Sequence, residues 1–274
     1  MAEPSYARSP RAWADIDLTA IAHNRNVLGA LVGPDVRVMA VVKADAYGHG
    51  IEAVSGTIGR SHPDGWFGVA TVPEACAVRR AAPAARIVVL APTLPEEADE
   101  VAACRATPVL SDPSGVTALA RAAEAEDIPL RVHIEVDTGM GRSGVAPDGL
   151  ASLVREIGKH RPLTIEALMT HFPDAEGRPE QAEHQILILR RQCEHLRTRY
   201  GLRVMLHAAN SAATIGLPES RLDMVRPGMA LYGLKPALPA HVPRPDLRSA
   251  LHLYTRVALV REMPKGHPVS YGGT

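Results

Sequence analysis

The feature that most constrains the fold is a regular alternation of short apolar runs with longer segments of helical period. Eight runs rich in Val, Ile and Leu are predicted as strands, at residues 36–42, 66–70, 86–90, 107–110, 130–136, 163–169, 203–206 and 222–225. Such alternation is typical of β/α units around a parallel sheet. A (β/α)8 barrel usually needs ~250 residues, and the chain has 274. We therefore predict an α/β fold, a (β/α)8 TIM barrel.

Helical periodicity between these runs supports the same fold. The helix candidates include 96–105, 113–125, 148–160 and 180–200, of which the last two are long and amphipathic. A doubly wound open sheet is the structural alternative, but its glycine-rich fingerprint does not follow the first strand. The barrel is preferred.

The two ends of the chain lie outside the barrel pattern. Segments 13–18 and 251–260 are predicted as strands of another sheet, the second from its alternating pattern, and a further strand is predicted from Pro268. We predict a barrel over 19–245 and a partial β-domain made of 1–18 and 246–274. A sheet of two or three strands is marginal alone, so we expect the chain to hold only the start of a C-terminal β-domain.

Composition narrows the class of protein. Thirty basic residues balance thirty acidic ones without a long run of like charge, so neither nucleic acid nor a membrane is expected as a partner. The sequence has no signal peptide and no apolar stretch of membrane-spanning length, which predicts a cytoplasmic protein. Cys76, Cys104 and Cys193 lack metal-ligand spacing. We expect reduced structural thiols, no metal site and a small-molecule enzyme.

The first predicted strand ends in the most informative residue. Active sites of these barrels lie at the C-terminal ends of the strands, and Lys43 leaves the apolar run VRVMAVV directly into the loop KADAYGHG. A partly desolvated lysine at that position can form a Schiff base. The alternative is a lysine that extends to solvent at a strand end.

Polar residues also follow the fifth and sixth strands. Arg142 lies in DTGMGRSG, where glycines let the backbone approach a ligand and the guanidinium offers a donor fork. The alternative is an ordinary glycine turn with a solvated arginine. His171, after the sixth strand, either orients a neighbouring donor or is a satisfied core residue.

The last two strands predict a phosphate site. Loops after strands seven and eight commonly hold phosphate through backbone N–H groups, and here they contain Ser211, Gly228 and Met229. A Schiff-base lysine and a phosphate site at the same end of the barrel together indicate pyridoxal phosphate. Arg226 is placed to meet the pyridine nitrogen of that cofactor.

Five motifs in this order, VVKADAYGHG, VDTGMGRSG, MTHF, HAANSAA and VRPGMALYGL, resemble those of the alanine racemase family. The resemblance implies a homodimeric isomerase that uses pyridoxal 5'-phosphate to interconvert L- and D-alanine for peptidoglycan synthesis. The alternatives are a non-catalytic barrel that binds the same cofactor and a racemase of another small amino acid such as serine.

The resemblance also implies a role for each residue that matches a family motif. Lys43 resembles the Schiff-base lysine and the base on the D-alanine face, and Arg142 the residue that contacts the cofactor's phenolic oxygen and the substrate carboxylate. Arg226 resembles the arginine that faces the pyridine nitrogen, braced by the residue matching His171. The phosphate-binding positions are matched by Tyr47, Ser211, Gly228 and Met229, with Asn210 beside them.

Two departures from the family pattern stand out. Many members carry a carbamylated lysine where this chain has Glu135; either this carboxylate supplies the charge that helps hold Arg142, or it faces solvent. The family's opposite-face tyrosine base and a further phosphate-binding tyrosine have no counterpart, and Tyr271 matches a stretch upstream of that base. The resemblance therefore predicts little or no racemase activity for the 274-residue chain.

Overall fold

The computed structural model describes residues 10–242 and 244–273, which fall into two compact units. Residues 17–250 form the larger unit. The smaller unit contains residues 10–16 and 251–273 of the described chain.

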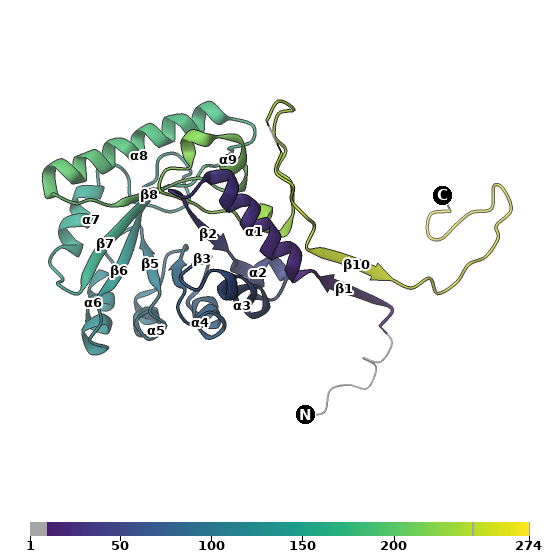
Figure 1. Ribbon diagram of the computed structural model, residues 1–274, viewed down its shortest axis with the longest axis horizontal. Coiled ribbons are helices and arrows are strands. Elements are labelled where there is room, and N and C mark those ends of the chain that lie inside the picture. The colour runs from purple at the N-terminus through teal and green to yellow at the C-terminus, as the bar shows by residue number, and fades with distance from the viewer. Residues whose placement is uncertain (1–9, 243, 274) are drawn as a thin grey trace. The chain divides into compact units, whose positions relative to one another are not determined.

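The larger unit is a closed barrel of parallel strands in sequence order, which confirms the predicted TIM barrel (Figure 1). In the described part of the chain its strands are β2 (Arg37–Val41), β3 (Trp66–Val69), β4 (Arg86–Val89), β5 (Thr107–Leu110), β6 (Leu130–Glu135), β7 (Leu163–Met169), β8 (Met205–His207) and β9 (Met224–Val225). Strand β2 pairs with β9 and closes the barrel. All polar loops that follow the strands consequently meet at one end, the C-terminal mouth.

Helices surround the strands (Figure 1). They are α1 (Leu18–Val32), α2 (Lys43–Gly48), α3 (Ile51–Ser61), α4 (Val72–Ala81), α5 (Ala98–Ala103), α6 (Val116–Ala125), α7 (Leu150–Ile157), α8 (Pro179–Tyr200) and α9 (Ser211–Gly216), with 3-10 turns η2 (Pro95–Glu97), η3 (Pro218–Ser220) and η4 (Met229–Tyr232). Local sequence fixes their ends: Thr71 and Glu74 form a capping box at α4, and Gly201 closes α8 at φ 67°. Within the described residues, no helix is both long and apolar enough to cross a membrane.

The barrel core is built from residues that alternate along the strands. One buried cluster takes a side chain from each of six strands, namely Met39, Trp66, Val88, Val109, Met169 and Met224. Burial of such side chains stabilises the fold by roughly 1.5–3 kcal/mol each relative to exposure. The cluster provides a rigid base for the loops of the C-terminal mouth.

The smaller unit is a two-stranded antiparallel sheet of β1 (Ala12–Ile16) and β10 (Leu251–Thr255). Trp13 stacks on Tyr254 with ring centroids 5.5 Å apart. The strand predicted over 251–260 ends at Thr255, and the prediction of a strand from Pro268 is wrong because residues 268–273 hold coil and turns. A strand needs a hydrogen-bonding neighbour, and the described residues provide no neighbouring strand for 257–273.

The interpretation of all three cysteines as reduced thiols is wrong for two of them. Cys76 on α4 and Cys104 just after α5 are joined by a disulfide, with Cα atoms 5.3 Å apart. The two cysteines are 28 positions apart in sequence with β4 between them, so the two helices follow successive strands and come together outside the barrel. Sequence separation therefore hid a spatial contact, whereas Cys193 is free.

Candidate functional site

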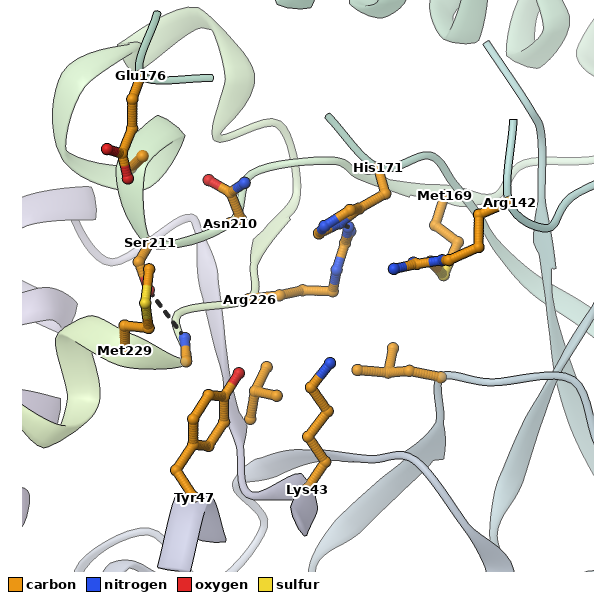
Figure 2. A pocket seen from close by; sticks show the side chains of 14 residues that line it. Lys43, Tyr47, Arg142, Met169, His171, Glu176, Asn210, Ser211, Arg226 and Met229 are labelled. Carbon is orange, nitrogen blue, oxygen red and sulfur yellow. Dashed lines mark hydrogen bonds between the residues drawn. The ribbon is translucent and has the colours of Figure 1, made fainter. Parts of the chain in front are cut away.

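The C-terminal mouth contains a cavity of about 260 Å³. Lys43 and Tyr47 extend into it from one side, and Arg226, His171 and Arg142 lie opposite them (Figure 2). The cavity is lined by Val41, Lys43, Tyr47, Leu90, Arg142, Met169, His171, Glu176, Asn210, Ser211, Ala212, Arg226, Gly228 and Met229. The structure thus brings together every predicted site residue except Glu135.

Lys43 stands at the start of an unusual backbone turn. The four residues from Ala44 to Tyr47 all have left-handed dihedral angles, with φ between 52° and 55°. Left-handed helical conformation costs non-glycine residues roughly 1–2 kcal/mol each, so surrounding contacts must hold the turn. It places the Lys43 and Tyr47 side chains in one cavity.

Two carboxylates hold this turn, and sequence reasoning missed both. One oxygen of Glu74 accepts a hydrogen bond from the Ala44 backbone N–H at 2.7 Å, and the other accepts from Ala70 N–H at 2.8 Å. Asp45 Oδ1 accepts from Ile51 N–H at 2.7 Å. The capping-box spacing of Thr71 and Glu74 indicated a helix start, but nothing in the sequence showed that Glu74 also reaches the lysine loop.

Tyr47 and Gly228 form a tightly fitted pair. A Cβ built on Gly228 would lie 2.5 Å from Tyr47 Oη, so only glycine leaves room for that hydroxyl. The Tyr47 ring packs on Tyr232, whose hydroxyl donates to Val41 O at 3.1 Å. Burial raises the pKa of Tyr47, so its hydroxyl stays protonated and can donate to an anion.

Ser211 organises the loop after β9. Its Oγ accepts hydrogen bonds from Gly228 N–H at 3.0 Å and Ala230 N–H at 3.1 Å, and the first of these is dashed in Figure 2. Asn210 Oδ1 accepts from Ala213 N–H at 3.1 Å and caps α9. Neither bond to Oγ uses the Ser211 hydroxyl hydrogen, so the Ser211 and Tyr47 hydroxyls can both donate into the cavity, as expected of a phosphate cradle.

Arg226 is buried and held from three directions. Its Nη2 donates to Thr170 O at 2.7 Å and Ala208 O at 3.0 Å, while Nη1 lies 2.8 Å from His207 Nδ1. Burial lowers the pKa of Arg226 to about 10, against an opposing effect of Glu135. The guanidinium remains charged at neutral pH, and within the described residues its Nε has no hydrogen-bond partner.

His171 is a neutral neighbour of this arginine. Its Nδ1 lies 3.3 Å from Arg226 Nη2, and an arginine can only donate, so Nδ1 is the acceptor and Nε2 carries the hydrogen. Burial, followed by the charges of Arg226, Arg142 and Lys43, lowers the pKa of His171 to about 3. The ring is uncharged at neutral pH.

Behind Arg226, the side chains of His207, His133 and Glu166 form a hydrogen-bonded file that sequence reasoning missed. His207 Nε2 lies 3.1 Å from His133 Nδ1, and His133 Nε2 lies 3.2 Å from Glu166 Oε2. Because Arg226 donates at its end, each histidine accepts through Nδ1 and donates through Nε2. Burial lowers the pKa of both histidines. The file connects the cavity with the opposite end of the barrel.

Glu135 lies outside the cavity lining and is only 2% exposed, so the solvent-facing alternative is wrong. Its Oε2 accepts a hydrogen bond from Ser143 Oγ at 2.6 Å. No ion pair joins it to Arg142 among the described residues; the contact is with the next residue of the loop. Arg142 itself is exposed at the cavity.

The charges of the cavity fit an anionic cofactor. Lys43, Arg142 and Arg226 contribute three cations, and Glu176 is the one acidic residue of the lining. The amine of Lys43, the cradle of Tyr47 and Gly228, and the buried guanidinium of Arg226 can hold an aldehyde, a phosphate and a ring nitrogen of one molecule. Pyridoxal phosphate carries these three groups.

Comparison with known proteins identifies the family. Residues 16–236 match the family model described as "Alanine racemase, N-terminal domain". The chain belongs to the alanine racemase family. An alanine racemase from Desulfovibrio desulfuricans is 36% identical over 273 residues, which cover 95% of this chain and 70% of that relative.

Solved alanine racemases have the same fold. That of Streptomyces coelicolor A3(2) is 34% identical with a TM-score of 0.84, over 96% of this chain and 71% of the other. The Bartonella henselae alanine racemase, described with covalently bound pyridoxal phosphate, is 25% identical with a TM-score of 0.82, over 97% of this chain and 72% of the other.

Proposed function

We propose that this chain interconverts L- and D-alanine with pyridoxal 5'-phosphate in the cavity at the C-terminal mouth, and that it supplies D-alanine for peptidoglycan. The observation that carries the proposal is the convergence of Lys43, the Tyr47–Gly228 pair and Arg226 on one cavity in a member of the alanine racemase family. When bound, the cofactor supplies an electron-withdrawing ring that acidifies the α-hydrogen of an amino acid.

The residues that line the cavity have different roles in this proposal. Lys43 holds the cofactor covalently and exchanges the α-proton on one face of the substrate. Tyr47, Ser211, Gly228 and Met229 bind the phosphate, with Asn210 positioning the loop by capping α9. Arg142, exposed at the cavity, binds the substrate carboxylate.

Arg226 sets the type of reaction. It stays charged and can only donate to the ring nitrogen, so it does not yield a proton as a carboxylic acid would. By leaving the ring nitrogen unprotonated, Arg226 would weaken the electron withdrawal by the bound cofactor and so favour return of the proton to the α-carbon over transamination. His171, through its contact with Arg226, orients the guanidinium.

The 274-residue chain alone is proposed to racemise slowly. Racemisation needs an acid or base on each face of the α-carbon, and loss of one typically lowers the rate ~10²–10⁴-fold. The other residues of the described lining that could act as this second acid or base already have contacts. His171 accepts a hydrogen bond from Arg226, Tyr47 packs against Gly228, and Glu176 accepts from Ala237 N–H at 3.1 Å. The homodimer, the cytoplasmic location and the domain limits at 19–245 stay predictions.

Borohydride reduction of the cofactor-loaded protein, followed by peptide mapping, tests the proposal. Label on Lys43, with none in Lys43→Ala, is expected; label on another lysine would contradict it. A racemisation assay with L-alanine and L-serine, with cofactor occupancy checked by visible absorbance, separates an alanine racemase from a serine racemase and from a cofactor-binding protein without turnover.

A further inference from the structure

A second cavity, of about 310 Å³, lies at the opposite, N-terminal mouth of the barrel. It is lined by Arg79 of α4, the first residues of β4, β5 and β6, and the segments that precede these strands. The lining consists of Arg79, Ala85, Arg86, Ile87, Arg105, Ala106, Thr107, Ile128, Pro129, Leu130 and Arg131. This volume is in the range of small-molecule sites.

The charge of this cavity is strongly one-sided. Four of its lining residues are arginines, and none is acidic. Glu166 is the only carboxylate paired with any of the four in the described residues; it contacts both Arg86 and Arg131. Four guanidinium groups against one carboxylate leave a net positive charge that a bound anion would neutralise.

Two of the arginines are fixed in place. Arg79 donates to the backbone carbonyls of Pro83, Ala85, Cys104 and Arg105. Arg79 pairs with no carboxylate among the described residues, and burial, followed by the charge of Arg105, lowers its pKa. Arg86 stacks over the Trp66 ring at 4.3 Å while it binds Glu166. Fixed guanidinium groups lose little freedom when they bind a ligand.

Arg105 and Arg131 have side-chain N–H donors that no other described residue uses. The Arg105 side chain makes no hydrogen bond or ion pair within the described residues, although its backbone is held at φ 51°, a conformation that arginine rarely adopts. Arg131 uses only its Nε, 3.2 Å from Glu166 Oε1.

A purely structural role does not explain this set. Arginine near a helix C-terminus compensates the helix dipole and pairs with free carbonyls, and Arg79 does so at the ends of α4 and α5. Arg131 lies on a strand, and the Arg105 side chain contacts no carbonyl.

We propose that this cavity binds a small phosphate-bearing anion, distinct from the cofactor. Planar guanidinium groups match phosphate oxygens in bidentate pairs. Arg105 and Arg131 supply the free donors for such pairs, and Arg79 and Arg86 add positive charge beside them. The apolar part of the lining, Ile87, Ile128 and Leu130, accommodates the organic portion of such a molecule.

Calorimetric titration of the cofactor-saturated chain with pyrophosphate tests the proposal. Pyridoxal phosphate that has been fixed by borohydride reduction, with the free cofactor removed, occupies the phosphate cradle at the other mouth, so binding that remains reports the second cavity. We expect one saturable site, weakened ~10-fold or more in Arg105→Gln and in Arg131→Gln because each loses charge-assisted hydrogen bonds. Arg191→Gln on α8, an exposed arginine outside both cavities, is the matched control and should bind like the parent.

Four results would overturn the proposal. Pyrophosphate binding that disappears on cofactor loading would belong to the cofactor cradle, and absence of saturable binding would remove the site altogether. An equal loss in Arg191→Gln would indicate a general charge effect. If citrate, a carboxylate anion, bound more tightly than pyrophosphate, the site would not be one for phosphate-bearing anions. Circular dichroism of each variant confirms that a loss of binding is not a loss of fold.

Discussion

His207 Nδ1 accepts a hydrogen bond from the Nη1 group of Arg226 at 2.8 Å, and both side chains are buried. The pair fixes the guanidinium that faces the cofactor site. It also begins the file that runs through His133 to Glu166. Positioning of Arg226 therefore depends on residues that never touch the cavity.

Replacing His207 with alanine should destabilise the chain. The change leaves a buried Arg226 donor and His133 Nδ1 without their partner, and an unsatisfied buried group costs ~1–3 kcal/mol, more when charged. Urea unfolding measures this free energy. His195→Ala, at an exposed position of α8, should change it by less than ~0.5 kcal/mol. Equal effects of the two substitutions would show that the His207–Arg226 contact carries no stability.

Gly228→Ala should weaken cofactor binding while leaving the fold intact. Its φ of −109° is not left-handed, although its ψ is −84°, and the added Cβ would meet Tyr47 Oη at 2.5 Å and push that hydroxyl out of the cradle. We expect a ~10-fold or larger rise in the Kd for pyridoxal phosphate, as a charge-assisted hydrogen bond is lost. Absorbance titration measures it.

The control for this substitution is Gly115→Ala, where an added Cβ meets nothing within 4 Å and φ is −90°. Its cofactor affinity should equal that of the parent. If Gly228→Ala also bound normally, Tyr47 would not contribute to the phosphate cradle.

Much of this architecture follows from short-range sequence signals. Runs such as 107–110 and 163–169 have the same bounds in the structure because apolar residues flanked by polar turns leave little choice of register. The strand predicted at 203–206 instead runs from Met205 to His207, because a buried histidine does not look like a strand residue. Predicted strand boundaries are wrong where contacts with residues distant in sequence, rather than the local apolar pattern, determine which side chains are buried.

The candidate site likewise contains some residues that the sequence predicts and others that it does not. Lys43, Arg142 and Arg226 follow apolar strands directly, so the topology of the barrel places them in one mouth. His133 and Glu166 were missed because they lie within predicted strands, where polar residues are expected to face outward. His207 opens the motif HAANSAA, but the motif does not show which residues its side chain contacts. Their partners are 19 to 74 residues away in sequence, and no local pattern encodes such pairings.

Glu74→Ala should loosen the lysine loop. The carboxylate accepts from the Ala44 and Ala70 backbone N–H groups and so holds a left-handed turn that is intrinsically unfavourable. We expect ~1–3 kcal/mol lower stability and a several-fold loss of cofactor affinity, with partial recovery in Glu74→Gln, which keeps one acceptor. Urea unfolding and absorbance titration measure the two effects.

Glu97→Ala is the matched control, since Glu97 also accepts a backbone hydrogen bond, from Leu94 N–H at 2.8 Å, at a helix start away from the lysine loop. It should lower stability without changing cofactor affinity. A similar loss of affinity in both variants would mean that general destabilisation, not the turn, controls the site.

Acid should destabilise the cofactor-free chain through its buried histidines. The pKa of His171 is about 3 in the folded protein, against 6.5 for an ordinary histidine, and those of His133 and His207 are also lowered. Between these values the unfolded chain binds protons that the folded chain does not, so stability is retained above pH 6.5 and falls as pH decreases below it. Each such histidine contributes up to ~1.4 kcal/mol per pH unit in that window.

Urea unfolding at pH 7 and pH 5 measures the effect as a difference between the two free energies of unfolding. We expect this difference to shrink by ~2 kcal/mol in His171→Gln and hardly at all in the exposed His195→Gln. An unchanged difference in His171→Gln would mean that the ring is protonated in the folded protein at pH 5, and its acceptor role toward Arg226 would then be wrong.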